Sequence, residues 1–433
     1  MTLKDIEQNG VIGAGGAGFP THIKLNSQPE VVIMNAAECE PLLHKDMEML
    51  LHFPDQILHG LMDVIRLTGA KKGIIGIKNK NRKVIDLLNS KISDPIKVVE
   101  LDDVYPAGDE ITLIYMTTGR IVQPGNLPVS VGCVVQNVET LYNIASNKPV
   151  VEKFISVAGA VENPATVKVP VGISFREVLK NFSITVVDYN VRSGGLMMGE
   201  LETDLDKPVS KKTGALIVLP SGHHCVTMYN RFATDHDTDR IAKAGCDQCY
   251  FCTEFCPRYL LGHPVRPETA MRNRMFTREE YPMIDPGNFS CCECNLCTMY
   301  ACPEGLDPKG ATVIEKRLLK AQDIKWQGND VSVHPMFEYR KVPTKKLMQR
   351  LDVLMFDDKG PLMDLEFLPE FVDIPLDQHI GAPAKSIVRE GDLVKKYQLI
   401  AKSMANVSSN VHASIDGKIK QITEKKITIL REK

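Results

Sequence analysis

Eight of the twelve cysteines in this 433-residue chain follow a regular spacing in two short blocks. The first block is Cys246-x2-Cys249-x2-Cys252-x3-Cys256, followed by Pro257, and the second is Cys291-x2-Cys294-x2-Cys297-x4-Cys302, followed by Pro303. Three cysteines separated by two residues wrap a tight loop around one corner of an iron–sulfur cube, and a fourth cysteine before a proline completes the pattern of two-cluster ferredoxins. The blocks therefore predict two [4Fe–4S] clusters.

In two-cluster ferredoxins the fourth cysteine of each block binds the cluster of the other block. This rule assigns cluster A to Cys246, Cys249, Cys252 and Cys302. It assigns cluster B to Cys291, Cys294, Cys297 and Cys256. Such clusters pass single electrons and require a partner that supplies or accepts them.

Two features leave alternatives open. Zinc also binds four cysteines, although its ligands usually come as two pairs separated by a longer stretch. The last gap of the second block is one residue longer than usual, so a bulge is expected there. Cys292, directly after Cys291, offers a different ligand for cluster B.

A glycine-rich stretch, VIGAGGAGFPTHIKL, covers residues 11–25. Its glycines leave backbone amides open to an anion, and Lys24 adds a positive charge. No Gly-Lys-Ser/Thr follows, which excludes a Walker loop. The stretch follows no strand, so it is not an ordinary dinucleotide-binding fingerprint either.

Polar loops follow apolar runs in the N-terminal third of the chain. Residues 31–34 read as a buried strand that ends at a polar loop. Similar polar loops follow apolar runs within 101–114 and 132–144. Residues 71–89 read as a strand followed by an amphipathic helix. Ligands of open α/β sheets bind at the carboxyl ends of strands. Residues 1–147 are therefore predicted to form an α/β nucleotide-binding domain.

Composition bounds the remaining possibilities. The chain is 43% hydrophobic, and its net charge is −2. We therefore do not expect nucleic acid to be a main partner. The N-terminal residues have no apolar signal core, and the one long uncharged run contains proline and glycine. We expect no membrane span and a cytoplasmic location, with the cysteines reduced and bound to metal.

The glycine loop, NAAECEP (35–41), YPAGDE (105–110) and QNVETL (136–141) together resemble a known family. They look like the NADH-oxidising flavoprotein subunit of respiratory complex I, and closer still like the RnfC component of Rnf complexes. The nearest resemblance is to the cobalamin reductases of propanediol-utilising bacterial microcompartments. The resemblance covers nearly the whole chain.

The resemblance implies that FMN lies on the N-terminal domain. Gly13, Gly15, Gly16 and Lys24 would hold its phosphate side. Asn35, Gly108, Asp109, Glu110, Asn137 and Thr140 would line its ring and ribityl chain. Glu38 would lie where NADH meets the flavin and is the catalytic candidate. NADH binding is in question, because Ala37 replaces an aspartate of the complex I flavoprotein, and Leu25 and Ser27 replace its aromatic residues.

The resemblance also orders the rest of the chain. Residues 148–220 resemble a soluble-ligand-binding β-grasp module, interpreted as a spacer near the flavin rather than a cobalamin or glycan site. Residues 236–325 would form a helical, ferredoxin-like domain with two clusters. Residues 370–433 resemble a barrel-sandwich (lipoyl-like) domain. The expected fold class is thus multidomain, α/β and α+β.

The expected function is an oxidoreductase that passes electrons from NADH through FMN and two [4Fe–4S] clusters to a corrinoid or a partner protein. The corrinoid rests on the resemblance alone, as do a location inside a microcompartment and a shell-protein partner. Two alternatives remain. The chain could be the electron-input subunit of an Rnf-type membrane complex, or a non-enzymatic iron–sulfur conduit or docking module.

Overall fold

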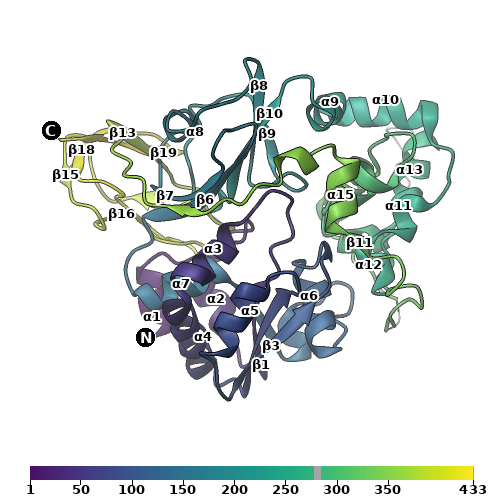
Figure 1. Cartoon of the computed structure of the whole chain (residues 1–433), viewed down its shortest axis with the longest axis horizontal. Helices are drawn as coiled ribbons and strands as arrows, with labels where there is room; N and C mark the ends of the chain where they lie inside the picture. The colour runs from purple at the N-terminus through teal and green to yellow at the C-terminus, as the bar shows by residue number, and fades with distance from the viewer. Residues whose placement is uncertain (277–283, 329, 433) are drawn as a thin grey trace.

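The structure, a computed structural model, describes residues 1–276, 284–328 and 330–432. Four regions follow one another along the chain (Figure 1). The N-terminal α/β region lies at the bottom of the view, the mixed sheet and the C-terminal strands lie side by side above it, and the cysteine-bearing helices lie at the right. This order agrees with the fold class predicted from the sequence.

The N-terminal region is built on a parallel sheet with the strand order β3-β2-β1-β5. Its strands are β1 (Val31–Ala36), β2 (Lys72–Lys78), β3 (Ile96–Leu101) and β5 (Cys133–Asn137). Its helices are α1 (Leu3–Gln8), α2 (Thr21–Leu25), α3 (Lys45–His52), α4 (Pro54–Thr68), α5 (Arg82–Asn89), α6 (Glu110–Thr118) and α7 (Val138–Ser146).

Helices cover both faces of this sheet, because successive side chains of a strand point to opposite sides. Val32 and Met34 of β1 belong to the apolar core shared with α4 and α7. Val31 and Ile33 belong to the core shared with α6. The uninterrupted apolar run of β1 is therefore explained by burial on both faces.

The second region is a mixed sheet in the order β12-β7-β6-β10-β8-β9. Its elements are β6 (Glu152–Gly159), β7 (Ala165–Pro170), α8 (Phe175–Leu179), β8 (Tyr189–Ser193), β9 (Glu200–Glu202), β10 (Ala215–Pro220) and β12 (Leu362–Met363). The parallel pair β6–β10 carries α8 over one face, as expected for a β-grasp-like module. Ser174 caps α8 by accepting a hydrogen bond from the Glu177 amide, which explains why the helix begins there.

The cysteine-bearing region is helical. It contains α9 (His224–Arg231), α10 (Asp235–Gly245), α11 (Phe251–Glu254), α12 (Pro257–Leu260), α13 (Pro267–Phe276) and α14 (Pro308–Ala321). The predicted domain 236–325 includes residues 277–283, which lie outside the described residues. No helix in the described part of the chain combines the length and the apolarity needed to cross a bilayer.

The chain then returns to the other regions through β11 (Val342–Pro343), which pairs with β4 (Val104–Tyr105), and through α15 (Thr344–Arg350). The C-terminal region has two sheets around one apolar core. Its strands are β13 (Phe371–Pro375), β14 (Lys385–Ser386), β15 (Leu393–Val394), β16 (Leu399–Lys402), β17 (Val411–His412), β18 (Gly417–Ile422) and β19 (Lys426–Arg431). The Ser414 hydroxyl donates to the carbonyl of Val171, 2.6 Å away, and so ties this region to the mixed sheet.

Gly60 generates a testable prediction, because it lets α4 approach α7 closely. A Cβ atom on Gly60 would lie 2.1 Å from the carbonyl oxygen of Leu141. Helix propensity alone would favour Gly60→Ala by about 1 kcal/mol. We expect the clash to outweigh this gain and to lower the free energy of unfolding by about 1–3 kcal/mol in urea titrations. Gly222→Ala is the control, since nothing lies within 4 Å of that Cβ position. An unchanged or higher midpoint for Gly60→Ala would show that separating the helices costs no more than the gain in helix propensity.

Candidate functional site: a cavity between three regions and the second cysteine block

A cavity of about 910 Å³ lies at the carboxyl ends of β1 and β5. Most of the cofactor candidates from the sequence line it: Gly15, Gly16, Asn35, Glu38, Gly108, Asp109, Glu110 and Asn137. They come from four separate loops of the N-terminal region. The sequence therefore predicted correctly that the loops after β1 and β5 meet, as strand-end loops of a parallel sheet do, and the glycine loop joins them although it follows no strand.

Three candidates stand outside the lining and support it instead. The amide of Gly13 donates to the carbonyl of Phe19 and closes the base of the glycine loop. The hydroxyl of Thr140 accepts a hydrogen bond of 2.9 Å from the amide of Ala14. Lys24 forms a 2.6 Å ion pair with Glu110, so its charge reaches the cavity only through that carboxylate.

The glycine loop presents backbone rather than side chains to the cavity. Gly16 has φ = +108°, a conformation that residues with a side chain rarely adopt, and nothing lies within 4 Å of its Cβ position. A Cβ on Gly15 would lie 3.5 Å from Cβ of Asn137. The open backbone at Gly15 and Gly16 fits an anion such as a phosphate.

Polar side chains at the strand ends hold the adjoining part of the wall. Asn35 donates to the carbonyl of Gly108 over 2.9 Å. Asn137 caps α7 by accepting from the amide of Glu139, and its amide group donates to Asp46 over 2.8 Å. Asp109 likewise caps α6. Because each helix begins at a cavity residue, packing of the helices fixes the shape of the cavity.

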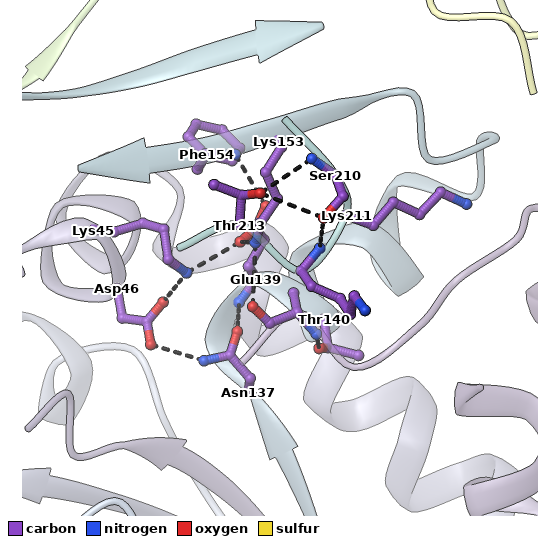
Figure 2. Close-up of polar contacts among 12 residues, drawn as sticks. Lys45, Asp46, Asn137, Glu139, Thr140, Lys153, Phe154, Ser210, Lys211 and Thr213 are labelled. Atoms are coloured by element: carbon purple, nitrogen blue, oxygen red, sulfur yellow. Dashed lines mark hydrogen bonds and ion pairs between the residues drawn. The ribbon is translucent and has the colours of Figure 1, made fainter. Parts of the chain in front are cut away.

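A buried cluster of charged residues (Figure 2) borders the cavity, and its members Lys45 and Asp46 belong to the lining. The carboxylate of Glu139 pairs with Lys153 and, over 3.0 Å, with Lys45, which also pairs with Asp46 over 2.6 Å. Burial alone would raise the pKa of Glu139, but Lys153 and Lys45 lower it below its ordinary value. Glu139 is therefore held as an anion, and two lysines compensate it.

Glu38 has a different environment. One carboxylate oxygen accepts from the amide of Asp46 over 3.2 Å, while the other is buried without a hydrogen-bond partner among the described residues. Burial, and secondly the charge of Asp46, raise the pKa of Glu38 to about 8. A carboxyl group that can hold a proton near neutral pH inside a cavity suits a proton-handling role. This environment favours Glu38 as the catalytic candidate.

The structure brings the cysteines together across the two blocks. Burial raises the pKa of the Cys252 thiol to about 12, with further contributions from Cys302, Cys246 and Cys249. Cys302 and Cys246 also pack in one apolar cluster. This arrangement fits the crossed assignment of cluster A.

The crossing recurs for cluster B. Burial raises the pKa of Cys256 well above its ordinary value, and Cys292 and Cys291 are its thiol neighbours. The long gap of the second block forms a π-helical turn over Cys297–Ala301, in which the amide of Cys302 donates to the carbonyl of Cys297. This turn confirms the expected bulge.

In the described part of the chain, no three His, Cys, Asp or Glu side chains converge as they do around one metal ion. A cubane holds its four thiolates at the corners of a larger polyhedron than a single zinc ion does.

The second cysteine block reaches the cavity itself. Cys292 and Cys294 are part of the lining, and the hydroxyl of Tyr105 donates to the carbonyl of Cys294 over 2.6 Å. Arg258, two residues after Cys256, forms a buried 2.7 Å ion pair with Asp109. A ligand in the cavity would thus lie directly beside Cys294, one of the four cysteines assigned to cluster B, and beside Cys292.

Comparison with known proteins identifies the family. The cobalamin reductase PduS of Salmonella typhimurium is 41% identical over 98% of this chain and 94% of its own length. PduS of Citrobacter freundii is 40% identical over the whole of this chain and 97% of its own length. The chain belongs to the PduS cobalamin reductase family. The resemblance stated from the sequence is confirmed.

Domain families and a more distant relative agree. The Nuo51 FMN-binding domain family matches residues 6–146, the 4Fe-4S dicluster domain family matches 245–307, and the RnfC barrel-sandwich hybrid domain family matches 358–432. A component of the proton-translocating ferredoxin:NAD(+) oxidoreductase complex of Clostridium ljungdahlii is 30% identical over 65% of this chain and 61% of its own length. The predicted fold class is confirmed, and FMN and [4Fe–4S] clusters are the cofactors of these domains.

Sequence reasoning missed two parts of the site. The first is the charged cluster of Lys45, Asp46, Glu139 and Lys153. The sequence signal that could have indicated it is the adjacent pair Lys45-Asp46, which follows the loop at the end of a strand. The second is the wall supplied by the β-grasp-like module, which the sequence analysis interpreted as a spacer. Its loops at 193–195, 198–200 and 207–214 line the cavity, and the C-terminal region adds Pro375, Asp377, Gln378, Lys425 and Lys426.

The raised pKa of Glu38 predicts a pH dependence of stability. The folded pKa of about 8 exceeds the ordinary 4.5, so the wild type loses stability as pH rises from about 4.5 to about 8. Glu38→Gln carries no such loss. The free energy of unfolding of this variant should rise relative to that of the wild type across this window and then level off. The full difference is about 1.4 kcal/mol for each unit of the pKa shift. Thermal unfolding at a series of pH values measures this, with the exposed Asp86→Asn as control. A pH-independent difference would contradict it.

The crossing of the cysteine blocks predicts which cluster each variant disturbs. Cys256→Ser should alter the paramagnetic resonance signal of cluster B, although Cys256 lies in the first block. Cys302→Ser should alter that of cluster A. The assignment of signals comes from Cys294→Ser and Cys249→Ser, which change one central ligand of each block. Loss of the same signal in Cys256→Ser and Cys249→Ser would show that each block binds its own cluster.

Proposed function

We propose that this protein is a reductase that takes electrons from NADH at a flavin in the cavity and delivers them, through two iron–sulfur clusters, to a corrinoid. One observation carries the proposal. The cavity formed by the FMN-binding domain is lined by Cys292 and Cys294, so flavin and cluster B would be neighbours with no intervening domain. The named activity of the PduS relatives supplies the acceptor.

The residues fit the flavin by chemistry. FMN exchanges two electrons with a nicotinamide and single electrons with an iron–sulfur centre. The open amides at Gly15 and Gly16 would hold its phosphate, and Asn35, Gly108 and Asn137 would line its ring side. Asp109 and Glu110 would complete the wall, with Gly13, Thr140 and Lys24 behind them. Glu38 would hold a proton near the reacting end.

The residues also fit the two clusters. Cys246, Cys249, Cys252 and Cys302 would hold cluster A, and Cys291, Cys294, Cys297 and Cys256 would hold cluster B. Cys249 is exposed, whereas Cys294, Cys297 and Cys256 are buried. Cluster B would therefore receive electrons from the cavity, and cluster A would lie nearer to an external acceptor.

Two finer points rest on the resemblance alone. We propose that the protein acts in the cytoplasm inside a bacterial microcompartment and contacts a shell protein. The order of domains favours this over a role in an Rnf-type complex. In this chain the barrel-sandwich match follows the FMN-binding domain, at residues 358–432, whereas in the Rnf subunit that the chain resembles it precedes the flavin domain.

Anaerobic addition of NADH to the reconstituted protein tests the function. The flavin bands should bleach first, the broad cluster absorbance should fall next, and added hydroxocobalamin should be reduced to the cobalt(II) form. Gly15→Val should lose FMN and all three responses to NADH, because its methyl groups would enter the anion site beside Asn137. Dithionite should still reduce the clusters of that variant. Gly222→Val, at an open surface turn, is the control.

Two results would contradict the proposal. FMN retention by Gly15→Val at the wild-type level would remove the flavin from this cavity. Bleaching of the flavin by NADH without any cluster or corrinoid reduction would leave only a flavoprotein with an unconnected cluster domain.

A further inference from the structure

The glycine loop is covered from outside the FMN-binding domain. The aliphatic stem of Lys212, from the β-grasp-like module, packs on Gly18, where a Cβ atom would lie only 2.8 Å from Cδ of the lysine. From the C-terminal region, the amide of Ile380 donates to the carbonyl of Gly18 over 3.0 Å. Two other domains therefore touch the loop that is expected to hold the flavin phosphate.

Lys212 differs from most of the other lysines near the cavity, because their ammonium groups are paired with carboxylates. Lys24 is paired with Glu110, Lys207 with Glu200 and Glu202, and Lys426 with Asp373. Lys212 lines the cavity and has no ion pair within the described ranges. Lys425, which also lines it unpaired, is exposed on the turn between β18 and β19, whereas Lys212 is partly buried against the glycine loop.

The backbone around Lys212 is fixed by its neighbours. The amide of Ser210 donates to the hydroxyl of Thr213, and the amide of Lys212 donates to the hydroxyl of Ser210. Figure 2 shows Ser210, Lys211 and Thr213 close to the buried charged cluster. The side chain of Lys211 is buried and donates to the carbonyl of Gly10 over 2.7 Å. This turn sends Lys211 into the protein and leaves Lys212 at the cavity.

From this placement we propose that Lys212 supplies the positive charge for the phosphate of the flavin mononucleotide at the glycine loop. The β-grasp-like module is then part of the cofactor site and not a spacer. The inference rests on the proposed function in that it requires FMN to occupy the cavity. A lysine ammonium is well suited to this task, as a point charge beside backbone amides that already face the anion.

The proposal separates two ligands that differ only in the phosphate. FMN carries the dianion, and riboflavin has the same ring and ribityl chain without it. Loss of a phosphate contact weakens FMN alone. A general disturbance of the cavity weakens both ligands.

The test measures the dissociation constants of FMN and riboflavin by quenching of flavin fluorescence on cluster-loaded protein freed of flavin. Lys212→Ala should weaken FMN roughly 10- to 100-fold, the range of a charged hydrogen bond, and leave riboflavin unchanged. Lys212→Arg should recover most of the FMN affinity. Lys180→Ala, an exposed lysine next to α8 and outside the cavity, is the matched control.

Three results would overturn the proposal. FMN affinity could be unchanged in Lys212→Ala, both flavins could weaken equally, or the phosphate-specific loss could occur in Lys24→Ala or Lys425→Ala instead. If the wild type binds neither flavin, the proposed function fails as well. If the wild type binds FMN and responds to NADH while Lys212→Ala binds it equally well, only this inference fails.

Discussion

The carboxylate of Glu139 lies where helix α7, strand β6 and helix α3 meet, and it is almost completely buried. It accepts from Lys153, from Lys45 and from the amide of Phe154. Removing one partner of a buried ion pair typically costs about 3–5 kcal/mol, because the other charge is left unpaired. The three elements must therefore keep their relative positions, and the cavity wall depends on them.

The same cluster shapes the glycine loop. Lys153 also donates to the carbonyl of Ala14, and the hydroxyl of Thr140 accepts from the amide of Ala14. Lys153 of the mixed sheet and Thr140 of the N-terminal region thus bind the carbonyl and the amide of Ala14. The loop cannot change its path unless the β-grasp-like module moves with it. A buried ion pair adds little net stability compared with apolar packing, but loss of one partner leaves an uncompensated charge, so this cluster penalises other positions of the loop.

The structural features that could be predicted from the sequence are those that depend on residues close together in the chain. The cysteine spacing, the glycine loop and the apolar strand at residues 31–34 are local patterns, and the polar ends of strands meet at one sheet edge by topology alone. Expectations of this kind correspond closely to β1 and the π-helical turn of the second block.

Contacts between distant segments could not be read in the same way. Lys45 reaches Glu139 across 94 positions of the chain, and Lys78 reaches Thr344 across 266. The loops at 193–195 and 207–214 consist largely of glycine, serine, proline and lysine, a composition that ordinary surface turns share. Their place in the cavity wall follows from how the mixed sheet packs on the first region, which no local pattern encodes.

Asp109 shows how these two kinds of constraint combine. Its side chain caps α6 within the FMN-binding domain, a local role, and pairs with Arg258 of the cysteine-bearing region, a contact 149 positions away. Nε of Arg258 is buried with no hydrogen-bond partner in the described part of the chain, and Cys292 lies beside this guanidinium. Nearby charge and hydrogen bonds to sulfur set the reduction potential of an iron–sulfur cluster. A single ion pair therefore links the cavity wall to the electrostatic environment of the second cysteine block, so a shift of the loop at Gly108 and Asp109 would change both sites together.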